Sequence, residues 1–174
     1  MAPHTKQFNP SETPGSKFDA LLLLTGHLNY AWTNTESMLI HMIAGLAGTD
    51  KETAVIIFLT LNTTRARVDL VERLAKRSQT PPDQQERVLA LTGRMMRFSA
   101  LRNRYSHSIY AFDPEDGAAR TIMMRIADRK TDLKMGRSDP VDANAIREIE
   151  DAISHLRDIN KGFWDVIREF GYPI

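Results

Sequence analysis

The chain of 174 residues contains no cysteine, which excludes disulfides, a thiol nucleophile, thiolate zinc sites and iron–sulfur clusters. It also lacks long hydrophobic runs: the longest, residues 54–59, has six residues. A membrane-spanning helix needs about 20. The first residues do not show the basic-then-apolar order of a signal peptide. We therefore expect a cytoplasmic protein that makes no contact with a membrane.

Neither sign of charge is in excess, since 23 lysines and arginines face 22 acidic residues and leave a net charge of +1. Several motifs of known chemistry are also missing from the sequence. It has no glycine-rich phosphate loop, no G-x-S-x-G, no H-E-x-x-H and no pair of Glu-x-x-His sequences for a di-iron site. We therefore expect neither a cofactor nor a metal.

Apolar residues recur every three or four positions over most of the chain, which is typical of helices. The pattern predicts four long helices over residues 17–47, 49–78, 81–105 and 142–170. Thr49, Thr80 and Asp142 are the expected caps of the last three helices, Thr49 in a capping box with Glu52. Because the first half of the second helix is nearly all apolar, we expect it to lie centrally.

The period changes after the third helix. Residues 108–112 and 121–126 read as strands joined by a turn over 113–117, and residues 132–135 add a short third strand. The predicted fold is thus mainly all-α: a four-helix antiparallel bundle with a small β-hairpin inserted between the third and fourth helices. Residues 1–15 are expected to form a flexible N-terminal tail. Residues 16–174 are expected to form a single domain, with the insertion at 108–136.

Positive charge is concentrated in the middle of the chain. Residues 65–104 contain ten basic residues and four acidic ones, and nine of the ten are arginines. Arginine binds phosphate through two parallel hydrogen bonds, so this stretch favours a nucleic-acid surface that includes Arg94, Arg97 and Arg104. The alternative is a solvated helix face that pairs with the acidic last helix.

Arg102, Asn103 and His107 lie together at the end of the third predicted helix. Histidine side chains titrate near neutral pH, arginine keeps its charge, and asparagine can orient a phosphate or a hydroxyl. These groups suffice for metal-free cleavage of RNA. On a straight helix Asn103 and His107 share a face, whereas Arg102 is turned about 140° from His107. Convergence then requires a bent arginine, a broken helix or a second subunit. The alternative is that Arg102 and His107 only stabilise the negative end of the helix.

The Arg102–His107 spacing resembles the R-x4-6-H signature of the HEPN superfamily. The first helix, with Trp32 and Glu36, also resembles that of bacterial HEPN-like hypothetical proteins, as does a hairpin before a final amphipathic helix. The resemblance covers residues 17–170. It implies a homodimer in which the motifs of two protomers form one site. It also implies a metal-independent endoribonuclease of the toxin or defence type that leaves 2′,3′-cyclic phosphate, with an antitoxin or another protein as a possible partner.

The resemblance also implies roles for individual residues. Arg102 would bind the scissile phosphate, His107 would act as general base or acid, Asn103 would orient the substrate, and Glu36 would orient His107. Residues 108–110 depart from the family pattern, because many members have a glycine after the histidine. Two other interpretations stay open: a non-catalytic dimeric helical interaction module, and a nucleotide-binding module.

Overall fold

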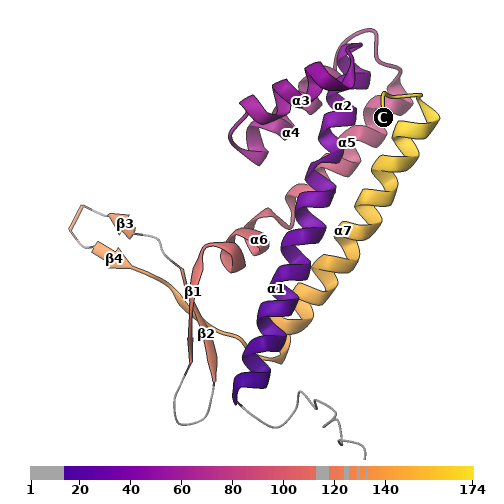
Figure 1. Ribbon diagram of the computed structural model, residues 1–174. Coiled ribbons are helices and arrows are strands. Elements are labelled where there is room, and N and C mark those ends of the chain that lie inside the picture. The colour runs from indigo at the N-terminus through magenta and orange to yellow at the C-terminus, as the bar shows by residue number, and fades with distance from the viewer. Residues whose placement is uncertain (1–13, 113–117, 124–125, 129, 132) are drawn as a thin grey trace, which may run out of the picture.

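The computed structural model of the protein describes residues 14–112, 118–123, 126–128, 130–131 and 133–174. Over these residues it shows seven helices and five short strands (Figure 1): α1 (Pro14–Glu36), α2 (Met38–Ala47), α3 (Lys51–Thr60), α4 (Thr64–Ala75), α5 (Pro82–Met96), α6 (Ser99–Ser106), β1 (Ser108–Phe112), β2 (Ala119–Met123), β3 (Ile126–Asp128), β4 (Leu133–Met135), β5 (Ser138–Pro140) and α7 (Ala143–Glu169). The predicted mainly helical class is therefore confirmed. No helix among these residues has the length and apolar character that a membrane span requires. Pro14 and Gly15, predicted in the tail, begin α1 instead, and residues 1–13 lie outside the described residues.

Three of the four predicted helices are each broken into two. The first breaks at Ser37, whose hydroxyl donates to the carbonyl three residues earlier at 2.8 Å. The second breaks before Thr63, whose side chain accepts the N–H of Ala66 at 3.1 Å and so starts α4. The third breaks near Phe98, whose N–H bonds the carbonyl three residues earlier at 3.1 Å. The apolar period continues through the breaks at Ser37 and Phe98 and therefore does not show them, whereas it lapses over residues 62–65 beside the break at Thr63.

Two of the predicted helix caps are wrong. The carboxylate of Asp50, not the hydroxyl of Thr49, caps α3 and accepts the N–H of Thr53 at 2.8 Å. A charged acceptor forms the stronger bond, which explains the choice. The hydroxyl of Thr80 bonds the carbonyl of Leu74 at 3.4 Å, and α5 begins without a side-chain cap.

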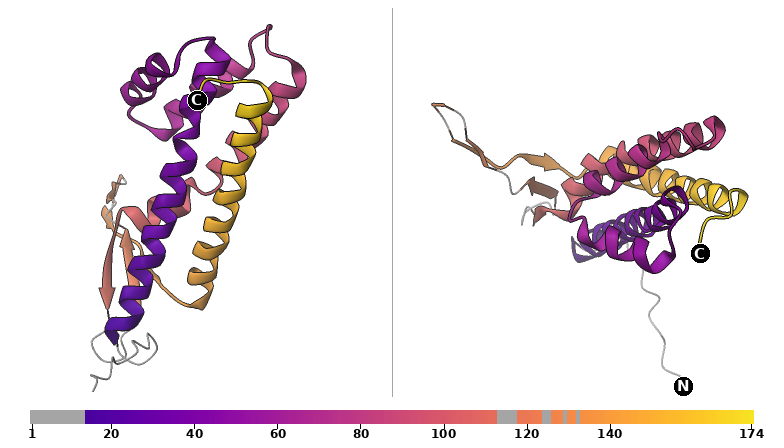
Figure 2. Two further views of the ribbon diagram at one scale, coloured as in Figure 1. Left: turned by 45° about the vertical axis from the view of Figure 1, so that its right-hand side comes forward. Right: turned by 90° about the horizontal axis from the view of Figure 1, so that it is seen from above.

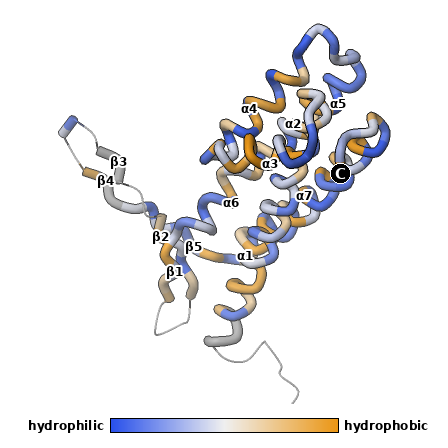
Figure 3. The backbone as a smooth tube through the Cα atoms, turned by 45° about the horizontal axis from the view of Figure 1, so that its top comes forward, coloured by the Kyte–Doolittle hydropathy of each residue, from blue (hydrophilic) through white to orange (hydrophobic). Residues whose placement is uncertain are grey.

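The core spans the long helices α1 and α7, which lie side by side, and α5, which packs against α7 (Figure 2). Buried residues of α2 and α4 complete it. Hydrophobic and hydrophilic stretches alternate along both long helices (Figure 3). As predicted, Asp142 caps α7 and accepts the N–H of Ala145 at 2.9 Å. Apolar residues recur every three or four positions along α7, and most of them are buried, namely Ile149, Ile153, Leu156, Phe163 and Ile167. Burial of each such side chain is worth roughly 1.5–3 kcal/mol, so this seam stabilises the fold.

The predicted central position of the apolar helix α3 is wrong. Ile56 and Leu59 are 61% and 65% exposed, and only Ala54 and Phe58 of this helix are buried. The reason is its placement: α3 lies at one end of the molecule beside α2 and α4, away from the seam between α1 and α7 (Figure 1). Composition alone could not reveal that an apolar helix would stay at the surface.

The strands form a three-stranded antiparallel sheet in the order β1-β2-β5 and a separate antiparallel pair of β3 and β4. The prediction for residues 108–112 is confirmed as β1, and the short strand predicted at 132–135 as β4. Of the predicted strand 121–126, residues 121–123 lie in β2 and residue 126 begins β3, while residues 124 and 125 lie outside the described residues. The predicted turn 113–117 lies outside the described residues. The sequence did not indicate β5, which ends in Pro140 at the edge of its sheet, where proline is tolerated. Because β1 starts directly after His107, the sheet adjoins the end of α6.

Candidate functional site

The Arg102–His107 motif lies on α6, and the helix ends at its histidine. His107 is the first residue past the helix, with φ −122° and ψ 12°, and its N–H still bonds the carbonyl of Asn103 at 3.1 Å. This bond keeps His107 one helical turn above Asn103. The predicted shared face of the two residues is therefore present.

Asn103, Arg104 and His107 line one open pocket of about 660 Å³. The other lining residues come from the α5–α6 region and from β2, namely Met96, Ser99, Ala100 and Met123. The side chains of Asn103 and His107 are exposed, whereas that of Arg104 is partly buried. The pocket thus presents an amide, a guanidinium and an imidazole from little more than one turn of helix.

Arg102 does not line this pocket, which departs from its predicted contact with the scissile phosphate. Its guanidinium carbon lies 5.7 Å from the ring centre of Trp32, and its NH1 donates to Oδ1 of Asn103 at 3.0 Å. Its Nε is buried and has no hydrogen-bond partner among the described residues. The physical reason is the helical geometry: neighbouring residues are turned by about 100°, so Arg102 emerges toward α1 while Asn103 faces the pocket.

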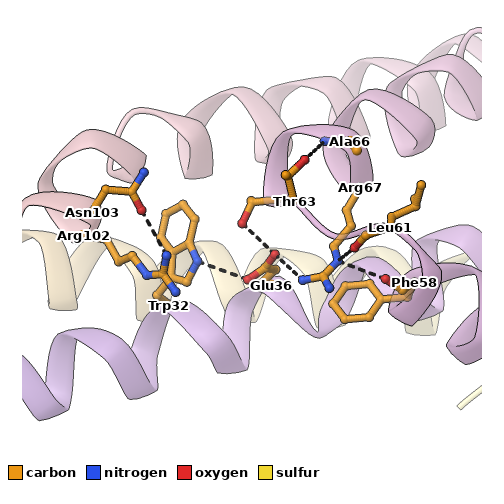
Figure 4. Close-up of polar contacts among 10 residues, drawn as sticks. Trp32, Glu36, Phe58, Leu61, Thr63, Ala66, Arg67, Arg102 and Asn103 are labelled. Atoms are coloured by element: carbon orange, nitrogen blue, oxygen red, sulfur yellow. Dashed lines mark hydrogen bonds and ion pairs between the residues drawn. The ribbon is translucent and has the colours of Figure 1, made fainter. Parts of the chain in front are cut away.

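Glu36 also lies apart from its predicted partner. Its Oε2 accepts the indole N–H of Trp32 at 3.2 Å, and its Oε1 accepts Arg67 NH1 at 2.8 Å and the hydroxyl of Thr64 at 2.7 Å (Figure 4). Every hydrogen bond found for this carboxylate within the described part of the chain goes to these three residues. The prediction that Glu36 orients His107 is therefore corrected: the carboxylate is buried and bound to Arg67 instead.

Residues on both sides of His107 are fixed by contacts that the sequence did not indicate. The hydroxyl of Ser106 donates to Oδ1 of Asn29 on α1 at 2.6 Å. The hydroxyl of Ser108 donates to the carbonyl of Arg104 at 2.5 Å. Tyr110 on β1 donates its hydroxyl to the carbonyl of Tyr105 at 2.6 Å. The side chains next to His107 in the sequence thus hold its backbone to α1 and to α6. The imidazole extends from this fixed segment.

Burial changes the titration of the two tyrosines near this backbone. Desolvation raises the pKa of the Tyr110 hydroxyl above its ordinary value, although the hydroxyl of Thr25 opposes the shift. Desolvation also raises the pKa of Tyr105, against the opposing charge of Arg104. Both hydroxyls therefore stay protonated to a higher pH than an ordinary tyrosine, and that of Tyr110 keeps the proton that it donates to the backbone.

The basic surface is only partly paired with acids. Arg94 and Arg97, near the end of α5, are exposed and have no ion pair among the described residues. Two other arginines are paired with acids of α7: Arg104 lies 3.8 Å from a carboxylate oxygen of Glu148, and Arg87 is bound to Glu169. The alternative of pairing with the acidic last helix thus holds for Arg87 and Arg104, while Arg94 and Arg97 remain available to an anionic partner.

Comparison with family models, curated proteins and solved structures gave no match to this chain.

Proposed function

We propose that the protein is a HEPN-like, cytosolic RNA-binding protein and a metal-independent endoribonuclease. The observation that supports this best is the pocket at the end of α6, which Asn103, Arg104 and His107 all line. An imidazole can move a proton, a guanidinium stabilises charge on phosphate, and an amide donates a hydrogen bond to a phosphate oxygen. Arg94 and Arg97 are exposed in the same part of the chain as Met96 and Ser99, which line the pocket, and would bind the flanking backbone of RNA.

The proposed reaction needs no group beyond the protein and the RNA. A nucleotide's 2′-oxygen attacks the adjacent phosphorus, the bond from phosphorus to the 5′-oxygen breaks, and a 2′,3′-cyclic phosphate remains. One group takes the proton of the 2′-hydroxyl and another gives a proton to the departing 5′-oxygen. His107 is the only histidine among the residues that line the pocket. We therefore propose a homodimer in which a second copy's motif supplies the other proton-transfer group, as the resemblance to the HEPN superfamily implies.

The test is incubation of the purified protein with a mixed RNA pool in EDTA, followed by analysis of the product ends. His107→Ala is compared with His27→Ala, because His27 is exposed on α1 and does not line the pocket. We expect cleavage with cyclic phosphate ends by the wild type and by His27→Ala, and none by His107→Ala. Equal cleavage by both variants would exclude this site, and dependence on added metal would exclude the mechanism.

One observation favours a second candidate function, a non-catalytic dimeric interaction module. Ile56 and Leu59 expose an apolar face on α3, which would be covered if another helix packed against it. Light scattering of the wild type and of the double variant Ile56→Glu/Leu59→Glu tests this. A dimer that becomes a monomer only in the variant, without RNA binding in either protein, supports the interaction module over the nuclease.

A further inference from the structure

We propose that Arg102 is a positioning residue that holds the Asn103 amide toward the pocket. We further propose that Arg102 is itself held by a brace of three side chains, the buried Trp32 and Glu36 and the partly buried Arg67 (Figure 4). Its catalytic consequence rests on the proposed function, but the brace is a property of the free protein. This positioning role differs from the role predicted for Arg102 from the sequence, which was to bind the phosphate.

The first step of the inference is the contact between Arg102 and Asn103. Arg102 NH1 donates to Oδ1 of Asn103 at 3.0 Å. An amide whose oxygen is held in this way presents its other end, Nδ2, as the donor. Nδ2 has no hydrogen-bond partner among the described residues, and Asn103 lines the pocket. Arg102 therefore selects the amide orientation that can donate to a phosphate oxygen.

The second step is the way in which Arg102 is held. Its guanidinium carbon lies 5.7 Å from the ring centre of Trp32, within the range of a cation–π contact. The described residues provide no carboxylate within ion-pair distance of it, and its buried Nε has no acceptor. The indole face and the Asn103 oxygen are thus the groups that fix this guanidinium. A guanidinium held on an indole is not free to reach into the pocket, which Arg104 lines instead.

The third step is the anchoring of Trp32 itself. Its side chain is 1% exposed, and its indole N–H donates to Glu36 at 3.2 Å. Glu36 in turn accepts Arg67 NH1 at 2.8 Å, while Nε of Arg67 donates to the carbonyls of Phe58 and Leu61 at 3.0 and 2.9 Å. The orientation of the indole is therefore fixed by an ion pair that joins α1 to α4 and to the end of α3.

The two roles of Arg102 predict different salt dependence. Each phosphate contact with single-stranded RNA changes the slope of log affinity against log salt by about 0.7. We expect Arg104→Met to reduce this slope by about that amount and Arg102→Met to leave it unchanged. Arg102→Met should instead lower kcat on the order of 10-fold to 100-fold with little change in KM, because the loss is one of orientation.

A second measurement does not depend on activity. In the ¹⁵N-labelled free protein, the side-chain amide signals of Asn103 are identified by their loss in Asn103→Asp. We expect Arg102→Met to shift these signals, and Trp32→Phe, which keeps a ring but loses the bond to Glu36, to shift them less. Arg157→Met is the matched control, since Arg157 is exposed on α7 and does not line the pocket.

Either measurement can overturn the inference. A salt slope that falls equally in Arg102→Met and Arg104→Met would make Arg102 a phosphate ligand. Asn103 amide signals that do not move in Arg102→Met would show that Arg102 does not hold the amide. If the wild type neither binds nor cleaves RNA, the proposed function fails while the signals of the free protein still decide the positioning role.

Discussion

The ion pair between Glu36 and Arg67 is the most informative place to perturb the fold. The side chains of Glu36 and Arg67 are only 9% and 18% exposed, and Oε1 of Glu36 lies 2.8 Å from NH1 of Arg67. Arg67 also donates to two carbonyls at the end of α3, and its guanidinium carbon lies 4.0 Å from the ring centre of Phe58. Arg67→Met therefore leaves a buried carboxylate without its counter-charge and frees two carbonyls from their donor.

Removal of one partner of a buried ion pair costs about 3–5 kcal/mol. For a domain of this size, that corresponds to a fall in Tm of roughly 6–20 °C, at about 2–4 °C per kcal/mol. Total stabilities are typically about 5–15 kcal/mol, so the variant should stay folded but lose a large share of its stability. Glu36→Gln should cost less than Arg67→Met, because the amide oxygen can still accept from Thr64 and Arg67.

The assay is urea unfolding followed by circular dichroism, for both single variants and the double variant. Because the double variant leaves no buried charge unpaired, it should lose less than the sum of the two single losses, by about 0.5–3 kcal/mol. Arg65→Met is the matched control on the same helix, since the Arg65–Asp69 pair is exposed and worth about 0–1 kcal/mol. A loss in Arg67→Met no greater than in this control would refute the reasoning.

Three further predictions concern backbone, titration and capping. Gly45→Ala should lose about 1–3 kcal/mol because its Cβ would overlap the ring of Tyr172. Gly93→Ala, with nothing within 4 Å of its Cβ, should gain about 0.5–1 kcal/mol, and the reverse order in thermal melts would contradict this. Burial raises the pKa of Tyr172 above 10.0. The contribution of its neutral hydroxyl to stability is therefore complete below pH 10 and is lost as the pH rises through the pKa of Tyr172 in the folded protein. Tyr172→Phe should flatten the fall in stability above pH 10, and an unchanged pH profile would exclude this cause. Asp142→Ala should cost about 1 kcal/mol as a lost cap of α7, whereas Asp142→Asn should cost less, and equal losses in urea unfolding would argue against capping.

Sequence patterns predicted the elements whose determinants are local. The stripe from Ile149 to Ile167 repeats every three or four residues, so it specified one continuous helix, and Asp142 marked its start. The strand at 108–112 was also predicted correctly. The breaks at Ser37, Thr63 and Phe98 were missed, because hydrophobic periodicity reports which positions face the core and does not mark where one helix ends and the next begins.

The candidate site shows the same division. Because Asn103 and His107 are four residues apart, their shared face follows from helical periodicity, and the structure places both in one pocket. The roles of Arg102 and Glu36 could not be obtained in this way. Glu36 and Arg67 are separated by 31 positions, and Trp32 and Arg102 by 70. Only packing of α1 against α4 and α6 decides which partner each charge finds.

The sequence by itself thus determined the mainly helical class, the amphipathic seam of α7 and the shared face of Asn103 and His107, because these depend on residue spacing along one helix. The tertiary structure alone decided that the apolar α3 lies at the surface, that Glu36 pairs with Arg67, and that Arg102 lies on Trp32 rather than in the pocket. The physical reason is that burial and charge pairing depend on which helices become neighbours. That choice is made by the whole packed chain and leaves no periodic signal in any one segment.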